Sequence, residues 1–390
     1  MQTTFEFGLK TKIICGEGKY QELGQLIPNL TGSNKAVIIT DKGVIAVGLV
    51  ALVEKALDEG GIDYSVFSDL ESDPSVTSID AAARVIRDFE ADCVIGIGGG
   101  SAMDVAKMAS LVAVGEESAS HYELMANPFP KKSITSIMMP TTSGTGAEVT
   151  STVVFSNTDK RKVWGWDEQM APDVAILDPL FTAGLPPHLT AATTLDALIH
   201  AIEACTGTRS NPIIEAYALK SIELISKNLE RVLQNPKDLE GRAALALGAT
   251  LAGGAIENGG TGIAHCIGHA IGTIGRVHHG RAVTIAMNVA YKWNVESDIP
   301  MFAKVAKAMG VNAEGLSESE LAYAGADRYL ELVHASGLNT SLKEDGLSLD
   351  DLNLLVETML SEENQPMRNN NCRLASEDEL RALATELLAE

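Results

Sequence analysis

Short apolar runs alternate with amphipathic stretches through the first half of the chain. The run Ala36–Thr40 is rich in β-branched residues and predicts a strand, and Val44–Glu59 after it has the apolar spacing of a helix. The same alternation predicts further strands at 64–67, 93–97, 136–139 and 174–177, extended pieces at 148–155 and 162–166, and helices at 78–90 and 101–114. Continuous apolar strands separated by helices are typical of a parallel sheet covered on both faces.

The pattern changes after Leu185-Pro186-Pro187. Long helical patterns then follow one another without a convincing strand, among them Ile213–Leu233, Gly241–Ile256 and Leu316–Ala335. We therefore place a domain boundary near Gly184. Residues 1–184 are expected to form an α/β, Rossmann-like domain with a mostly parallel sheet, and residues 185–390 an all-helical domain.

Composition and charge narrow the class of protein. The 390 residues are 45% hydrophobic, and 30 basic against 52 acidic side chains give a net charge of −22, which disfavours nucleic acid or an anionic membrane as a partner. The five cysteines are scattered without a Cys-x-x-Cys pair, as expected of reduced thiols. The N-terminal residues MQTTFEFGLK lack the pattern of a secretory signal, and no charge-free stretch resembles a membrane span. We expect a cytoplasmic protein.

A glycine-rich turn follows the predicted strand 93–97. Gly96-Ile97-Gly98-Gly99-Gly100-Ser101 ends a strand and opens a helix, where the backbone can approach a phosphate and the helix N-terminus offers free amides. Ser101 and Asp104 have the spacing of a capping pair, and Lys107, one turn further, can stay solvated. An ordinary tight turn is the alternative, and we favour a pyrophosphate site.

Two other strand ends carry polar groups. Asp41 follows the predicted strand 36–40, where a carboxylate can accept hydrogen bonds from a ribose diol and would repel a 2′-phosphate. This favours NAD over NADP, although Asp is as often a simple cap or turn residue there. The loop 140–146, PTTSGTG, can cradle phosphate or carboxamide groups with its hydroxyls and amides, or form a polar turn.

Histidines cluster in the second half of the chain. Four of the eight fall within fifteen positions: His265, His269, His278 and His279. In an earlier predicted helix Asp196 and His200 are four residues apart and share one face, and His265 and His269 repeat this spacing. Three imidazoles and one carboxylate suit Fe(II), Zn(II), Mn(II) or Co(II) and differ from a thiolate zinc site. The grouping favours a catalytic divalent metal over separate, solvated or core histidines.

Together these features resemble the iron-containing (group III) alcohol dehydrogenases. Four elements occur in the family's order: Asp41 in TDKGV, the GIGGGSAMDVAK turn, the PTTSGTGAEVT loop, and Asp-x3-His, then His-x3-His, then His-Gly. The resemblance covers essentially the whole chain. It implies a dehydroquinate synthase-like architecture in which the first domain binds NAD(P) and the second holds one metal.

The resemblance also implies roles for individual residues. It assigns the metal to Asp196, His200, His265 and His279, and places His269 near the nicotinamide and substrate as a catalytic residue that is not a ligand. The cofactor-contacting positions of the family match Gly98, Gly99, Ser101, Thr141, Thr142, Thr145 and Lys162. Departures from the family pattern leave the ligands intact and the substrate open; they are Asp73-Pro74, His278, Trp164-Gly165-Trp166 and Val283.

The implied activity is that of a metal-dependent, NAD(P)-linked alcohol dehydrogenase or aldehyde reductase. The metal would stabilise an alkoxide, hydride would pass to the nicotinamide, and His269 or a ribose hydroxyl would relay the proton. Fe2+ is implied by the family, and Zn2+ ranks above it in intrinsic affinity.

Three alternative functions remain: a dehydroquinate synthase-like lyase that uses NAD transiently, a metal hydrolase, and a catalytically silent binding module.

The alternation of apolar and polar residues around Phe5 and Phe7 could form an edge strand. Family members often dimerise through such strands, so we expect a homo-oligomer.

Overall fold

A computed structural model describes residues 4–70 and 73–389. Their contacts form two compact units. The α/β unit is Leu9–Leu185; the helical unit contains the residues from Pro186 onward together with the N-terminal residues through Gly8. The described residues therefore run from the helical unit (residues 4–8) into the α/β unit and then back to the helical unit.

A six-stranded parallel sheet forms the centre of the α/β unit. Its strands are β1 (Lys12–Cys15), β2 (Lys35–Ile39), β3 (Asp63–Phe67), β4 (Cys93–Gly98), β5 (Thr135–Pro140) and β8 (Val174–Leu177). They lie in the order β1-β8-β5-β4-β2-β3, and every pair is parallel. The parallel α/β architecture predicted from the apolar runs is confirmed, whereas β1, a half-buried edge strand, was not predicted.

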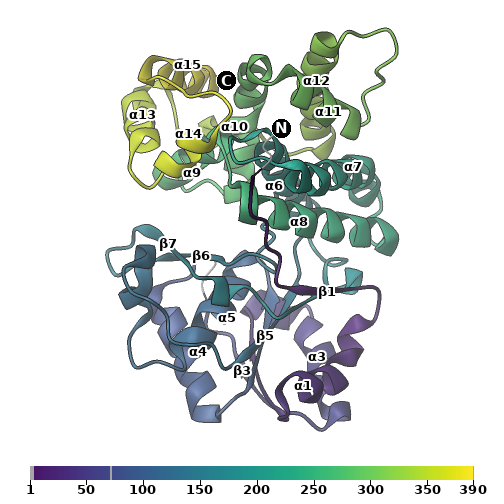
Figure 1. The fold of residues 1–390 in the computed structure, drawn as a ribbon, viewed down its shortest axis with the longest axis vertical. Helices are drawn as coiled ribbons and strands as arrows, with labels where there is room; N and C mark the ends of the chain where they lie inside the picture. The colour runs from purple at the N-terminus through teal and green to yellow at the C-terminus, as the bar shows by residue number, and fades with distance from the viewer. Residues whose placement is uncertain (1–3, 71–72, 390) are drawn as a thin grey trace. The chain divides into compact units, whose positions relative to one another are not determined.

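Alternate residues of the buried strands enter two different cores. Val37 and Ile39 of β2 pack with the helices α4 (Val76–Phe89) and α5 (Gly100–Val112), while Ile38 packs with α1 (Leu23–Thr31) and α3 (Leu49–Gly60). Figure 1 shows these two helix pairs on opposite faces of the sheet. The single helix predicted over 44–59 is wrong, because the chain breaks at Gly48 (φ 81°) into α2 (Lys42–Ala46) and α3.

Helix α5 departs from the sequence-based prediction at its start and on one face. Its N-cap is Gly99, so Ser101 and Asp104 do not form the predicted capping pair. Lys107 is fully buried rather than solvated: its Nζ donates to the carbonyl oxygens of Thr150 (3.2 Å) and Thr152 (2.7 Å) and pairs with Asp104 at 3.0 Å. These bonds attach the antiparallel hairpin of β6 (Thr152–Ser156) and β7 (Lys162–Trp166) to α5.

The strand order contains a switch point. From β2 the chain moves outward to β3, and then returns to the other side of β2 to form β4. In open α/β sheets, ligands bind outside the carboxyl ends of the strands where the order reverses in this way. Asp41 follows β2 and the glycine turn ends β4, so both lie at this point.

The helical unit is built around α6, which is buried on nearly all sides. The helices of this unit are α6 (Pro187–Thr206), α7 (Pro212–Gln234), α8 (Leu239–Gly259), α9 (Ile263–Gly275), α10 (His279–Asn294), α11 (Ile299–Ala308), α12 (Glu318–Ser336), α13 (Leu352–Leu360), α14 (Gln365–Asn370) and α15 (Glu377–Ala389). Helix α6 packs on α7, α8 and α10. Over 186–389 the structure contains no strand, which confirms the all-helical prediction. Among the described residues, no helix has the length and apolarity needed to cross a bilayer.

The N-terminal residues lie against this unit. The Phe7 ring packs on Tyr217 with centroids 5.3 Å apart, and the backbone of Gly8 both donates to and accepts from the side-chain amide of Asn258. The residues around Phe5 and Phe7 form no strand within the described chain.

Candidate metal centre and dinucleotide turn

Helix α6 supplies two polar side chains to a buried place. Asp196 and His200 lie one turn apart and are only 2% and 5% exposed, on a helix whose other faces are filled by aliphatic side chains. A buried carboxylate is retained only when it is paired, hydrogen-bonded or bound to a metal. The helix therefore directs a pair of potential ligands into the interior of the unit.

The other two histidines come from consecutive helices. His265 lies in the first turn of α9, and α9 ends at Arg276 in the left-handed conformation (φ 54°), so that α10 can start at His279 close to it. Gly280 lets α10 approach α6 closely: a Cβ there would lie 2.9 Å from the carbonyl carbon of Ala192 and 3.3 Å from Cβ of Asp196. The absence of a side chain at Gly280 thus brings His279 beside Asp196.

The four side chains meet around one carboxylate oxygen. The Nε2 atoms of His200, His265 and His279 lie 3.8, 3.5 and 3.6 Å from Oδ1 of Asp196. One donor atom from each of the four residues lies within 4.8 Å of the other three. Ligands bound at about 2.1 Å to a tetrahedral ion would be separated by about 3.4 Å. The set therefore has the dimensions of a site for a single divalent ion.

Two of the donor atoms have unmet bonding capacity. Asp196 Oδ1 and His265 Nε2 are buried and have no hydrogen-bond partner within the described part of the chain. Buried polar atoms normally have hydrogen-bond partners, and an exception of this kind is typical of an atom that binds a water or an ion. Three neutral nitrogen donors and one carboxylate suit borderline divalent metals such as Fe2+ and Zn2+. The residues present fit a divalent metal ion.

The charges within the group shift the pKa values of two of its members. Burial alone would raise the pKa of Asp196, but the neighbouring imidazoles of His200, His279 and His265 outweigh it and hold that pKa well below its usual range. Burial favours the neutral ring of His265, yet the carboxylates of Glu203 and Asp196 raise its pKa to about 9. A divalent cation would replace the positive charge that the anionic oxygens now draw onto the imidazole.

His269 lies beside this group and outside it. Its ring centroid is 5.2 Å from that of His279 and 6.2 Å from that of His265, and the residue is exposed. His265 and His269 are one helical turn apart on α9, but their environments differ. His265 is buried with the other proposed ligands, and His269 is open to solvent.

The predicted dinucleotide residues converge at the glycine turn. Gly98 has φ 155°, and a Cβ there would lie 2.6 Å from Cβ of Ala102 and 3.5 Å from Oδ2 of Asp41, so the close approach requires glycine. Thr141 N donates to Gly98 O at 2.9 Å. The threonines of the loop after β5 also face the turn: Thr142 lies beside Gly99 and Thr145 beside Gly100.

Three other predicted positions have more local roles as well. Asp41 Oδ1 accepts from Val44 N at 3.0 Å and caps α2, while its other oxygen faces the glycine turn. Ser101 lies in the first turn of α5. Lys162 lies apart from the turn's own elements, on β7, where it pairs with Asp73 at 3.7 Å. The structure thus groups Asp41 with the turn and leaves Lys162 on the neighbouring hairpin.

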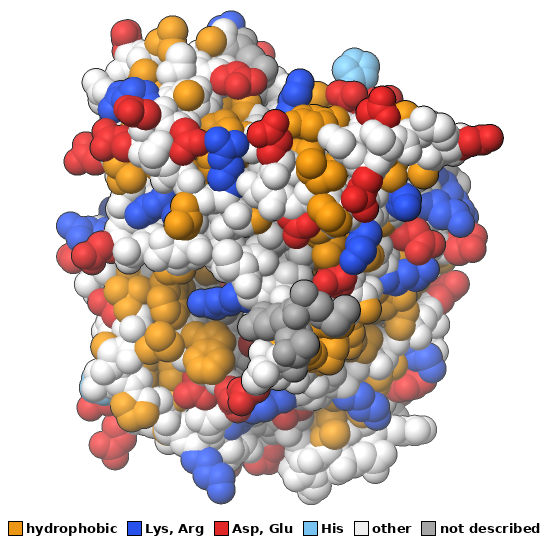
Figure 2. All heavy atoms as spheres, turned by 45° about the horizontal axis from the view of Figure 1, so that its top comes forward, with side chains coloured by type: hydrophobic (Ala, Val, Ile, Leu, Met, Phe, Trp, Pro, Cys, Tyr) orange, Lys and Arg blue, Asp and Glu red, His pale blue; other side chains and the backbone are white. Residues whose placement is uncertain are grey.

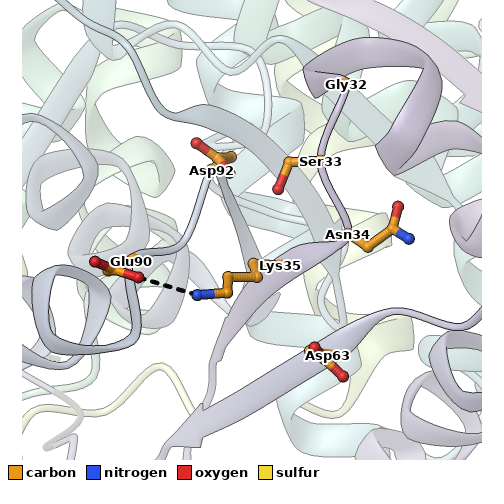
Figure 3. Close-up of a pocket in the computed structure, with 7 residues that line it drawn as sticks. All are labelled: Gly32, Ser33, Asn34, Lys35, Asp63, Glu90 and Asp92. Carbon is orange, nitrogen blue, oxygen red and sulfur yellow. Dashed lines mark hydrogen bonds and ion pairs between the residues drawn. The ribbon is translucent and has the colours of Figure 1, made fainter.

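An open pocket lies at the opposite end of the sheet. Lys35, Asp63 and Asp92 surround it at the amino ends of β2, β3 and β4, and Lys35 pairs with Glu90 at 3.2 Å (Figure 3). None of these residues was predicted to be functional. On the face drawn in Figure 2, basic side chains are scattered among acidic ones and between small hydrophobic patches.

Comparison with known proteins decides the family. Two protein-family models match the chain. The model described as "Iron-containing alcohol dehydrogenase" matches residues 10–179, and the model described as "Fe-containing alcohol dehydrogenase family, C-terminal" matches residues 190–388. The chain belongs to the iron-containing alcohol dehydrogenase family. This membership confirms the resemblance read from the motifs, the predicted two-part architecture and the predicted class of enzyme, an NAD-linked alcohol dehydrogenase or aldehyde reductase.

Relatives within the family resemble the chain over most of its length. The NAD-dependent methanol dehydrogenase of Bacillus methanolicus is 32% identical over 348 residues, 88% of this chain and 90% of that protein. The sulfoacetaldehyde reductase of Bilophila wadsworthia is 33% identical over 375 residues, 95% and 96% of the two chains. The structure of sulfoacetaldehyde reductase from Bifidobacterium kashiwanohense in complex with NAD+ superposes with a TM-score of 0.90 at 27% identity and covers 100% of both chains.

Sequence reasoning missed one polar residue of this site. Glu203 is 3% exposed, and its Oε2 lies 2.5 Å from Nδ1 of His265. Its signal was present in the sequence, because Glu203 follows Asp196 by seven positions, two helical turns along the same face of α6.

Proposed function

We propose that this chain catalyses the reversible, NAD-linked interconversion of a small alcohol and its aldehyde at a centre in which Asp196, His200, His265 and His279 hold Fe2+. The observation that carries the proposal is the convergence of three Nε2 atoms on one buried carboxylate oxygen that accepts no hydrogen bond from the described residues. When bound, the divalent ion supplies Lewis acidity toward an alcohol or carbonyl oxygen. Zn2+ is the alternative metal for the same donors.

The glycine turn would hold the cofactor. Gly98 and Gly99 leave the backbone open where α5 begins, so the amides at this helix N-terminus can bind the pyrophosphate. Thr141, Thr142, Thr145 and Ser101 offer hydroxyls around the same turn, and Lys162 offers a cation from β7. Asp41 would accept hydrogen bonds from the ribose hydroxyls, and its charge disfavours the 2′-phosphate of NADP.

His269 would serve as the proton carrier. Its ring lies next to that of His279 but is exposed, so it can exchange a proton with solvent as the alcohol loses one or the aldehyde gains one. We further propose that the enzyme acts in the cytoplasm as a homo-oligomer. The described cysteines are free thiols, which supports a reducing location.

Loss of the metal centre tests the proposal. His265→Ala should abolish bound metal and alcohol-dependent NADH formation while the protein still binds NADH. His278→Ala provides the matched control, because His278 is exposed and precedes a proposed ligand without belonging to the group. Full turnover by metal-free His265→Ala would contradict the assignment.

Two further measurements separate the alternatives. Net NADH formation from an alcohol distinguishes a dehydrogenase from a dehydroquinate synthase-like lyase, which reoxidises its NADH within each turnover. Reconstitution of the metal-free protein with anaerobic Fe2+ or with Zn2+ identifies the active ion. Restoration by Zn2+ alone would remove iron from the proposal.

A further inference from the structure

We infer that Glu203 is a positioning residue of the metal centre: one buried carboxylate holds both the start of α9 and Nδ1 of His265, and so directs Nε2 of His265 toward the ion. This rests on the proposed function, because it assumes that an ion binds between Asp196 and the three histidines. The inference concerns a residue outside that ligand set, and it follows from the hydrogen bonds around Glu203.

Helix α9 begins without a cap from its own sequence. Its N-cap is Gly262, which has no side chain to accept a bond, and the first amides of a helix lack partners within the helix. Distant side chains accept these bonds instead. Glu203 accepts from Gly262 N (2.8 Å) and Ala264 N (2.7 Å), and Asn371 Oδ1 accepts from Ile263 N (3.2 Å).

The charge of Glu203 suits this position. The N-terminus of a helix carries a partial positive charge, which a carboxylate stabilises more than a neutral acceptor does. Glu203 is nearly fully buried, so its charge is screened little by solvent. The carboxylate therefore determines where α9 starts relative to α6, and with it the position of the His265 backbone.

The same carboxylate orients the ring. Glu203 Oε2 lies 2.5 Å from Nδ1 of His265. An ionised carboxylate can only accept, so Nδ1 must carry the proton of this bond, and the lone pair of the neutral ring is then on Nε2. That atom is the one 3.5 Å from Asp196 Oδ1. A carboxylate on the far nitrogen of a ligating histidine also makes the ring a better donor.

Ligands and positioning residue share one rigid element. Asp196, His200 and Glu203 occupy the i, i+4 and i+7 positions of α6, and all three are buried. Two turns of one helix thus carry two proposed ligands and the group that aligns a third.

The rival explanation is that Glu203 only caps α9. Asn371→Ala separates the two roles, because it removes another tertiary cap of the same helix and has no bond to the His265 ring. Glu203→Gln keeps the size and polarity of the side chain and removes the charge that requires a proton on Nδ1.

The experiment measures the affinity of metal-free protein for Co2+ by chelator competition, the visible spectrum of the Co2+ form, and the thermal midpoint without metal. Wild type should show the intense spectrum of a low-coordinate Co2+ site. Glu203→Gln should bind Co2+ about 10–100-fold more weakly with a shifted spectrum, whereas Asn371→Ala should lower the midpoint and leave affinity and spectrum near wild type. If Glu203→Gln folds and has the Co2+ affinity and spectrum of wild type, the positioning role of Glu203 is overturned and the metal centre is not. If wild type itself does not bind Co2+, both the proposed metal centre and the positioning role are overturned.

If Glu203→Gln does not fold, wild-type protein still decides the question. In the Zn2+-loaded enzyme labelled with 15N-histidine, the His265 signals can be assigned by their loss in His265→Gln. The inference expects a proton on Nδ1 in a strong hydrogen bond and no proton on Nε2. A proton on Nε2 would overturn it.

Discussion

Replacing Gly280 by alanine should separate α10 from α6 and open the metal centre. The added Cβ would lie 2.9 Å from the carbonyl carbon of Ala192 and still closer to its oxygen. These are backbone atoms of a buried helix, so they cannot rotate away as a side chain could. Restoring an ordinary contact of 3.4 Å to that carbon requires 3.4 − 2.9 = 0.5 Å of movement, a lower limit because the oxygen is nearer.

This movement affects both stability and ligation. Overpacking of this kind costs about 1–3 kcal/mol, which for a unit of this size corresponds to a loss of roughly 2–12 °C in thermal midpoint at about 2–4 °C per kcal/mol. His279 is the residue before Gly280, so its Nε2 would shift by more than the roughly 0.2 Å that metal-ligand distances tolerate. We expect the affinity for Zn2+ or Co2+ to fall at least about tenfold, a change of about 1.4 kcal/mol.

Gly272→Ala is the matched control for this variant. Gly272 lies in α9, and its added Cβ would meet nothing nearer than the carbonyl oxygen of Val277 at 3.5 Å, an ordinary contact. Alanine is the better helix former, so this control should be up to about 1 kcal/mol more stable than wild type. Differential scanning fluorimetry without metal and chelator competition with metal measure the two effects. Wild-type stability and affinity in Gly280→Ala would show that the close packing of α6 and α10 does not position His279.

Substitutions at three other positions test separate parts of the structure. His269→Gln should lower kcat by about 10²–10⁴-fold at unchanged metal content, as measured by steady-state kinetics and metal analysis; unchanged kcat would remove His269 from proton transfer. Asp41→Asn should keep the cap of α2 and reduce the preference for NAD over NADP in kcat/KM. Asp41→Ala should lose that preference and also about 1 kcal/mol of stability from the cap. Equal preference in wild type and in both variants would exclude Asp41 from ribose recognition. Lys107→Met should destabilise the α/β unit by about 3–5 kcal/mol, because it leaves Asp104, whose side chain is only 14% exposed, without its cation; a denaturant midpoint equal to that of wild type would contradict this role.

The parts of the site that depend on local spacing were predictable. Asp196 and His200 lie on one helical turn, so their shared face follows from the period of the helix. The same rule placed His265 and His269 together, but it could not show that one is buried and the other exposed. That difference depends on α6 and α10 packing against α9, and only the family resemblance assigned His279 to the group in advance.

The errors have the same physical origin. The solvated Lys107 and the cap formed by Ser101 and Asp104 were inferred from neighbours within α5. Lys107 and Asp104 instead bond to the backbone of residues 150–154, in β6 and just before it, which lie 43–50 positions further along the chain. Glu203 was overlooked for a similar reason, because its partners His265 and Ala264 are about 60 positions away. Helix periodicity shows which side of a helix is polar, and tertiary packing decides what that side meets.

The route of the chain through the two units limits how the protein can be divided. The helical unit includes a segment that precedes the α/β unit in the sequence, since Phe7 packs on Tyr217 and Gly8 bonds to Asn258. A fragment starting at Pro186 would expose the Tyr217 ring where Phe7 packs on it, and the side-chain amide of Asn258 would lose its hydrogen bonds to Gly8. Joining the two termini and opening the chain elsewhere would instead keep every piece of the helical unit together, which makes circular permutation the better way to obtain it in isolation.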